Sequence, residues 1–303
     1  MRHYLFFLTC VLLACSPRQQ ADNAFDVSVK TPAFHGEPKV LLDEAHHNMH
    51  KASGTYKPFV NLLANDGCSV RNNTELFSEG SLAGYNLLVI ANAKGGEHDN
   101  KQTAAFTDAE CEAVKRWVEA GGSLLLIADH YPFGSAAENL AQKFGVHMFN
   151  GETSDTIYFT GNAEFKDRLV FSKENGLLAL NEITQGSSAS DAVNTVIADR
   201  GQSLSIPDSA IVLLKLSPAS LHALPDSIWT DGNKTYTRFA SPVSAYGNCQ
   251  GLAIKAGRGR VVVLGEASML TAQTFKDEKF GMNSGDNDNK QFTLNLVRWL
   301  LKK

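Results

Sequence analysis

Four short apolar runs that each end in polar side chains constrain the fold of this chain most strongly. The runs are 40–42, 87–90, 124–127 and 261–264, and the polar residues that follow them include Asp43, Asn92, Asp129 and Glu266. Such runs are typical of parallel strands buried on both faces, which deliver polar side chains at their carboxyl ends. In open α/β sheets, ligands bind at that edge.

Helical patterns lie between and after these runs. Thr107 and Glu110 form a capping box, and Gly121-Gly122 ends the helix that follows it. Further amphipathic helices are predicted over 135–144 and over the last residues of the chain, where Phe292 and Leu296 share one face. This alternation predicts a doubly wound, mostly parallel α/β sheet, flavodoxin-like in arrangement, with the run 124–127 near its centre.

The alternation stops at about residue 151. Short strand-like runs at 156–160, 169–171, 211–216, 227–230 and 235–240 lie between Gly, Asn, Asp, Ser and Pro clusters. We therefore expect an inserted antiparallel β region over about 151–240 within a domain that spans 39–303. The sheet resumes with a hairpin that turns at 256–259.

The N-terminus has the pattern of an export signal. An apolar segment at 5–13 is too short to span a bilayer and precedes Leu12-Leu13-Ala14-Cys15, which looks like a bacterial lipobox. We expect a signal peptide over 1–14, lipidation of Cys15 and a polar tether over 15–38. Ser16 follows Cys15, which by analogy favours the outer membrane facing the periplasm. An ordinary cleaved signal with an incidental Cys15 is the alternative.

Charge and cysteine content exclude several classes of protein. The chain has 28 basic and 32 acidic residues and no basic run, so a nucleic-acid surface is not expected. Outside the export signal, Cys68, Cys111 and Cys249 have no C-x-x-C spacing, which indicates neither a disulfide framework nor a zinc module. Nucleotide-binding glycine motifs and a G-x-S-x-G elbow are also missing.

The strand-end residues form one candidate site. We expect catalytic roles for Asp43, His46, Asp129, His130 and Glu266, and ligand contacts from Asn48, Asn92, Asn283 and Asp288. Mixed nitrogen and oxygen ligands suit a divalent metal, and the candidate ligands are Asp43, His46, Asp129 and His130. The alternative is that strand-end Asp and Asn residues cap helices while the histidines bond nearby backbone groups. His47, His50 and His98 are expected on the surface.

Three motifs together resemble the class I glutamine amidotransferase-like superfamily, and most closely a bacterial lipoprotein branch of it. They are 43–48 (DEAHHN), 121–130 (GGSLLLIADH) and 265–268 (GEAS), and the pairing of 288–289 with 298–300 adds to them. The resemblance implies a flavodoxin-like sheet. Members that hydrolyse glutamine carry a nucleophilic Cys after the central strand, but residues 128–132 here read ADHYP. Thiol chemistry is therefore not expected.

Three functions remain compatible with the sequence. The first is an envelope lipoprotein whose amidotransferase-like domain binds a small polar or glycan ligand at the carboxyl edge of the sheet. The second is a hydrolase that uses the Asp/His cluster around a metal or as acid and base. The third is an envelope scaffold that binds a protein partner through the β insertion. An apolar exposed patch on 151–240 would favour the third.

The lipobox generates the first prediction. Cys15→Ala removes the thiol that would carry the acyl chain, so the variant should no longer incorporate labelled fatty acid and should leave the membrane fraction. Metabolic labelling and fractionation measure both effects. A variant that still carries the label and still sediments with membranes would show that Cys15 is not the anchor.

Overall fold

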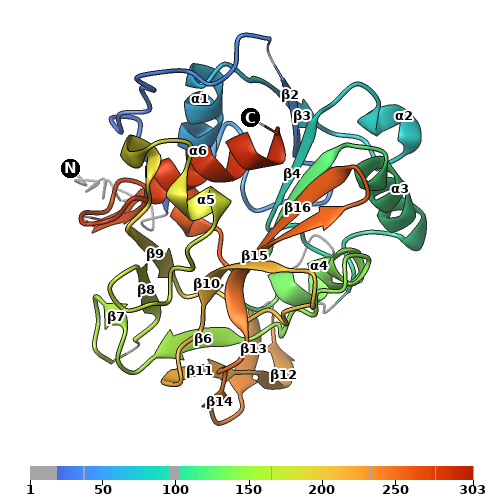
Figure 1. Ribbon diagram of the computed structural model, residues 1–303. Helices are drawn as coiled ribbons and strands as arrows, with labels where there is room; N and C mark the ends of the chain where they lie inside the picture. The colour runs from blue at the N-terminus through green and yellow to red at the C-terminus, as the bar shows by residue number, and fades with distance from the viewer. Residues whose placement is uncertain are drawn as a thin grey trace, which may run out of the picture.

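Seven strands form the largest sheet of the computed structural model, which describes residues 19–36, 38–95, 103–164, 166–232, 234–276 and 278–302 (Figure 1). Their order across the sheet is β10, β15, β16, β5, β4, β2, β3. Their bounds are β2 Lys39–Asp43, β3 Ser69–Asn73, β4 Leu87–Ala91, β5 Ser123–Ile127, β10 Ile211–Lys215, β15 Cys249–Ala256 and β16 Gly259–Leu264. Strands β16, β5, β4, β2 and β3 are parallel, whereas β15 pairs antiparallel with β16 on one side and with β10 on the other.

Helices cover both faces of this sheet. They are α1 (Lys57–Asn65), α3 (Asp108–Glu119), α4 (Phe133–Gln142) and α6 (Asn289–Leu300), with the short α2 (Glu79–Leu82), α5 (Glu182–Gln185), η1 (Ala189–Asp191) and η2 (Ser268–Leu270). Apolar residues of α1 and α6 share one hydrophobic cluster with alternate residues of the strands, and those of α3 and α4 share a second. Every residue of β4 and β5 is buried as a result, which explains their continuous apolar runs.

The predicted order of elements is confirmed in this part of the chain. Strand β5 is the fourth of the seven and so is central, as its apolar run predicted. At the start of α3, Thr107 Oγ1 accepts the Glu110 N–H at 3.3 Å, and Glu110 Oε2 accepts the Thr107 N–H at 3.0 Å. Two backbone donors of the first turn are thereby satisfied, as the capping box predicted.

The region 151–240 is mostly antiparallel, as expected. Its strands are β6 Glu152–Asp155, β7 Phe159–Thr160, β8 Arg168–Ser172, β9 Thr195–Asp199, β11 Ser220–Ala223, β12 Pro225–Asp231 and β13 Lys234–Phe239, followed by β14 Val243–Ser244. They form the sheets β14-β11-β6, β7-β8-β9 and β12-β13. Strands β6, β9 and β11 lie outside the expected runs. Strand β10 was expected but belongs to the main sheet, because it pairs with β15 and so covers that edge.

The described part of the expected tether packs on the domain instead. Strand β1 (Gln20–Ala21) pairs with β17 (Ala272–Phe275), which pairs with β18 (Glu278–Gly281). Phe25, Val27 and Val29 then pack on an apolar cluster that α1 and α6 share. Burial of these alternating apolar side chains is favourable, so the segment packs against the domain instead of forming a free tether. Residues 1–14 and Cys15 lie outside the described residues, and no described helix has the length and apolarity needed to cross a membrane.

Candidate functional site

A cavity of about 850 Å³ lies at the carboxyl edge of the parallel strands. The loops that follow β2, β4, β5 and β16 each line it, through Met49, His50, Lys94, Asp129, His130 and Ser268. The opposite wall comes from the antiparallel region and includes Asp167, Arg168, Asp199 and Arg200. The sheet edge predicted from the sequence therefore does border a cavity of ligand size.

Asp129 is held at this edge by backbone bonds on both sides. Its N–H donates to Asn92 Oδ1 at 2.9 Å, and its carbonyl accepts Gln202 Nε2 at 2.9 Å. Its Oδ1 accepts the His130 N–H at 2.7 Å. An ionised carboxylate can accept about four hydrogen bonds, so Asp129 keeps acceptor capacity toward the cavity.

Two further carboxyl groups lie close to Asp129. Glu266 is fully buried, with Oε1 accepting the Ser268 N–H and hydroxyl and Oε2 accepting the Met269 N–H. Burial, followed by the charges of Asp129 and Asp199, raises the pKa of Glu266 well above its ordinary value. Burial also raises the pKa of Asp199, although Arg168 opposes that shift. Burial first, and then the neighbouring carboxylates, therefore favour the protonated form of Glu266.

The two arginines of the cavity, Arg168 and Arg200, are paired within the wall. Arg168 Nε donates to Asp199 Oδ1, and its guanidinium lies 4.9 Å from the Phe280 ring centroid. Arg200 Nη2 donates to Asp167 Oδ2 at 2.9 Å. The cavity thus offers donors and acceptors side by side rather than a field of one sign.

Gly201 brings the antiparallel region against the sheet edge. At its φ of +89°, an added Cβ would lie 2.5 Å from the Gly265 carbonyl oxygen, so only glycine fits. Next to it, the Gln202 N–H donates to the Gly265 carbonyl at 2.7 Å, and Gln202 Nε2 also donates to the carbonyl of Ala128. These bonds fix Asp199 and Arg200 opposite Asp129.

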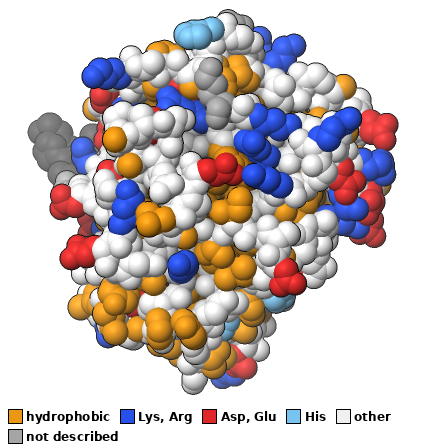
Figure 2. Space-filling view, viewed as in Figure 1, with side chains coloured by type: hydrophobic (Ala, Val, Ile, Leu, Met, Phe, Trp, Pro, Cys, Tyr) orange, Lys and Arg blue, Asp and Glu red, His pale blue; other side chains and the backbone are white. Residues whose placement is uncertain are grey.

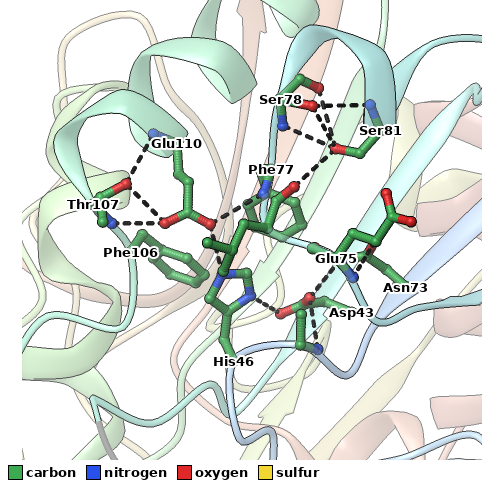
Figure 3. Close-up of polar contacts among 12 residues, drawn as sticks. Asp43, His46, Asn73, Glu75, Phe77, Ser78, Ser81, Phe106, Thr107 and Glu110 are labelled. Carbon is green, nitrogen blue, oxygen red and sulfur yellow. Dashed lines mark hydrogen bonds and ion pairs between the residues drawn. The ribbon is translucent and has the colours of Figure 1, made fainter.

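Asp43 and His46 do not join the cavity. His46 Nδ1 bonds Asp43 Oδ2 at 2.8 Å and its Nε2 bonds Glu110 Oε1 at 2.8 Å, in a buried network (Figure 3). The ring packs against Phe77 and Phe106, at centroid distances of 4.6 and 4.8 Å. Both ring nitrogens are therefore used internally, and the network holds the loop after β2 against the start of α3.

The predicted metal site is not formed. Within the described ranges, no three His, Cys, Asp or Glu side chains are arranged to hold a metal ion. Of the four expected ligands, Asp129 and His130 line the cavity, whereas Asp43 and His46 are closed off in the network with Glu110. An acid–base site in the cavity cannot use Asp43 and His46 either, because neither residue lines it.

The four expected binding residues support backbone. Asn48 Oδ1 accepts the His46 N–H and Asn92 holds Asp129, so both act behind the cavity wall. Asn283 Nδ2 donates to the Gln273 carbonyl at 3.0 Å, and Asp288 Oδ2 accepts the backbone N–H groups of residues 194 and 195. None of the four is among the residues that line the cavity.

Several cavity residues were not predicted. Asp199 and Arg200 follow the apolar run 196–198, the same strand-end pattern that identified Asp129, so the sequence did carry a signal for them. His50 was expected on the surface, but it is 4% exposed and its Nδ1 bonds Thr55 Oγ1 at 2.6 Å. Burial lowers the pKa of His50 to about 4, so its ring is neutral at pH 7. His47 is exposed as expected, and His98 lies outside the described residues.

Comparisons with known proteins bear on the fold. No family model and no curated protein matches the sequence. Among solved structures, the mmIFT52 N-terminal domain is similar at 15% identity, with 86% of this chain and 97% of that chain covered and a TM-score of 0.61. A protein from Bacteroides uniformis described as ThuA-like is 14% identical over 90% of this chain and 93% of that one, with a TM-score of 0.43. A cytoplasmic protein from Salmonella typhimurium is 10% identical over 87% and 98%, with a TM-score of 0.46. At 15% identity, the likeness to the mmIFT52 N-terminal domain supports a mixed α/β fold and no activity.

The His46 network generates the second prediction. Burial lowers the pKa of His46, but the hydrogen bonds and charges of Asp43 and Glu110 outweigh it, so the net pKa is raised. The stability that the protonated ring contributes is therefore complete below the unfolded-state pKa of about 6.5. It is lost as pH rises through the higher folded-state pKa. We expect the difference in unfolding free energy between wild type and His46→Gln to shrink from pH 6 toward alkaline pH.

Urea denaturation across this pH range measures that difference. The control is His47→Asn, which changes an exposed neighbouring histidine outside the network and suits its left-handed backbone, φ +51°. A difference for His46→Gln that stays constant or grows with pH would show that the ring is not held protonated by the two carboxylates.

Proposed function

We propose that the cavity binds a small, hydroxyl-rich polar ligand of the glycan class. The observation that carries this proposal is the position of Asp129, a half-buried carboxylate with acceptor capacity in a cavity at the carboxyl edge of a parallel sheet. A carboxylate bonds sugar hydroxyls strongly, because the acceptor is ionised.

The rest of the cavity wall supports an uncharged polar ligand over an ionic one. Arg168 and Arg200 are already paired with Asp199 and Asp167, so the wall is largely neutralised by its own ion pairs. Tyr131, Phe133 and Phe280 add apolar ring surface to a lining that also contains polar groups. Sugars present both hydroxyl groups and apolar C–H faces, which match such a wall.

Binding is better supported than thiol catalysis. The turn after β5 carries no cysteine, and the three described cysteines, Cys68, Cys111 and Cys249, are buried. Burial raises the pKa of each of these thiols, which disfavours the nucleophilic thiolate.

We further propose that the domain is a flavodoxin-like member of the class I glutamine amidotransferase-like superfamily that lacks the nucleophilic thiol. The order of its parallel strands supports this: β3, β2, β4, β5, β16 is 2-1-3-4-5 in chain order. We also propose that Cys15 anchors the protein as an outer-membrane lipoprotein facing the periplasm. The lipobox and Ser16 support this localisation.

A scaffold role through the β insertion is a second candidate, favoured by a specific surface. Trp229 of β12 and Tyr236 of β13 are 49% and 40% exposed, with rings stacked at 5.5 Å. Ile157, Val243 and Tyr246 are also exposed. Figure 2 shows hydrophobic side chains gathered at the lower end of this face, where Figure 1 places β6 and β11 to β14. Exposed apolar side chains in such a group are typical of interaction surfaces.

The third prediction tests the glycan site. Asp129→Asn keeps the side-chain shape but removes the charge, so affinity for the bound sugar should fall by about 10-fold or more, as the loss of a charge-assisted hydrogen bond implies. Calorimetric titration of wild type with a panel of mono- and disaccharides, including N-acetylhexosamines and muropeptide fragments, identifies the ligand first. The control is Asp208→Asn, an exposed aspartate away from the cavity lining.

The two candidate functions give different results in this experiment. A panel in which no sugar binds wild type, or in which Asp129→Asn binds as tightly as Asp208→Asn, would contradict the glycan site. Trp229→Ser should leave sugar binding unchanged, because Trp229 does not line the cavity.

A further inference from the structure

The described chain begins at the rim of the cavity. Gln19 lines the cavity, and the next two residues are fixed by pairing with β17, Gln20 opposite Thr274 and Ala21 opposite Gln273. The point where the N-terminal segment meets the fold is therefore set by backbone hydrogen bonds.

The lipobox cysteine is only four residues upstream of that point. A fully extended chain spans at most about 3.6 Å per residue, so Cys15 lies within about 14 Å of Gln19. When acyl chains on Cys15 enter a bilayer, so short a connection keeps the cavity rim near the lipid headgroups. It leaves too little chain for the domain to turn its other faces to the membrane freely.

The β17–β18 hairpin beside β1 extends the same rim. Lys276 and Lys279 are exposed on it, and Phe275 and Phe280 are half-buried next to them. Asp277 and Glu278 offset the charge of the two lysines in the sequence, and Lys279 Nζ lies 3.6 Å from Asp22 Oδ2. The hairpin therefore adds no net positive charge, and the orientation follows from the short connection to Cys15. Phe280 and Glu278 also line the cavity, so hairpin and cavity share one rim.

We infer that the cavity mouth faces the membrane and that the cavity takes a polar headgroup presented by a lipid, rather than a ligand from free solution. This inference rests on the proposed acylation of Cys15 and names the source of the proposed hydroxyl-rich ligand. Asp129, Arg168, Asp199 and Arg200 in the wall suit a headgroup and disfavour hydrocarbon, because burying charge against acyl chains is costly. The headgroup enters while the acyl chains stay in the bilayer.

Fluorescence quenching on vesicles tests the orientation. The lipidated full-length protein is labelled with bimane at Asn162→Cys, an exposed residue of the cavity lining, or at Ala83→Cys, an exposed residue that precedes β4 at the opposite edge of the sheet. The native Cys68, Cys111 and Cys249 are buried, and protein without an added cysteine measures their residual labelling. Each protein is reconstituted into phosphatidylcholine vesicles that contain a lipid with a nitroxide on its headgroup.

We expect the headgroup nitroxide to quench the label at 162 at least about threefold more than the label at 83, since the short connection to Cys15 holds that rim near the headgroups. Iodide in the aqueous phase should quench the label at 162 less on vesicles than in detergent, and the label at 83 equally in both. A Gly-Ser linker inserted after Pro17 should abolish the headgroup quenching at 162.

Equal headgroup quenching at the two positions, or iodide access at 162 that vesicles do not reduce, would overturn the inference. Mass spectrometry of the N-terminal peptide reports acylation separately. An unacylated Cys15 would overturn the inference, because the orientation depends on the acyl anchor. It would not affect the proposed sugar site, which the binding of soluble sugars to wild type and Asp129→Asn tests separately.

Discussion

The parallel pairing of β2, β4, β5 and β16 is the constraint on which the rest of this structure depends. Val40 pairs with Leu87, Leu87 with Ser123, and Arg260 with Ser123, so the strands run in step and end at one edge. Helices bury both faces of these strands, and backbone groups inside the sheet have no water to bond. Polar chemistry is therefore confined to the strand ends, where the loops after all four strands line a single cavity.

The polar side chains that follow β2 and β5 have different environments. Those after β2 are buried against α3, whereas the carboxylate after β5 faces the cavity. After β2, His46 meets Glu110 from the capping box of α3, and Asp43 completes a buried network that uses both ring nitrogens (Figure 3). After β5, Asp129 bonds through its backbone to Asn92 and Gln202, so its carboxylate stays available. The sequence located both groups, but the partner of His46 lies 64 residues away and periodicity carries no information about it.

Sequence patterns predicted the elements that local chemistry determines and missed those that distant pairing determines. The strands of the parallel sheet, the Thr107 cap and the β15–β16 hairpin all have local signals, and all are confirmed. Strand β10 was assigned to the insertion, because only its pairing with β15 shows that it belongs to the main sheet. Asp199 and Arg200 do follow a local apolar run, 196–198, but only the contact of Gly201 with Gly265, between distant segments, places them opposite the sheet edge.

Binding of a hydroxyl-rich ligand in the cavity beside Asp129 can be observed in crystals. The measurement is an electron-density map of crystals soaked with the tightest-binding sugar, compared with a map of unsoaked crystals. We expect a sugar ring in the cavity with a hydroxyl group within hydrogen-bond distance of the Asp129 carboxylate. Ordered water alone in the cavity, with the sugar bound elsewhere or at the Trp229–Tyr236 surface, would contradict it.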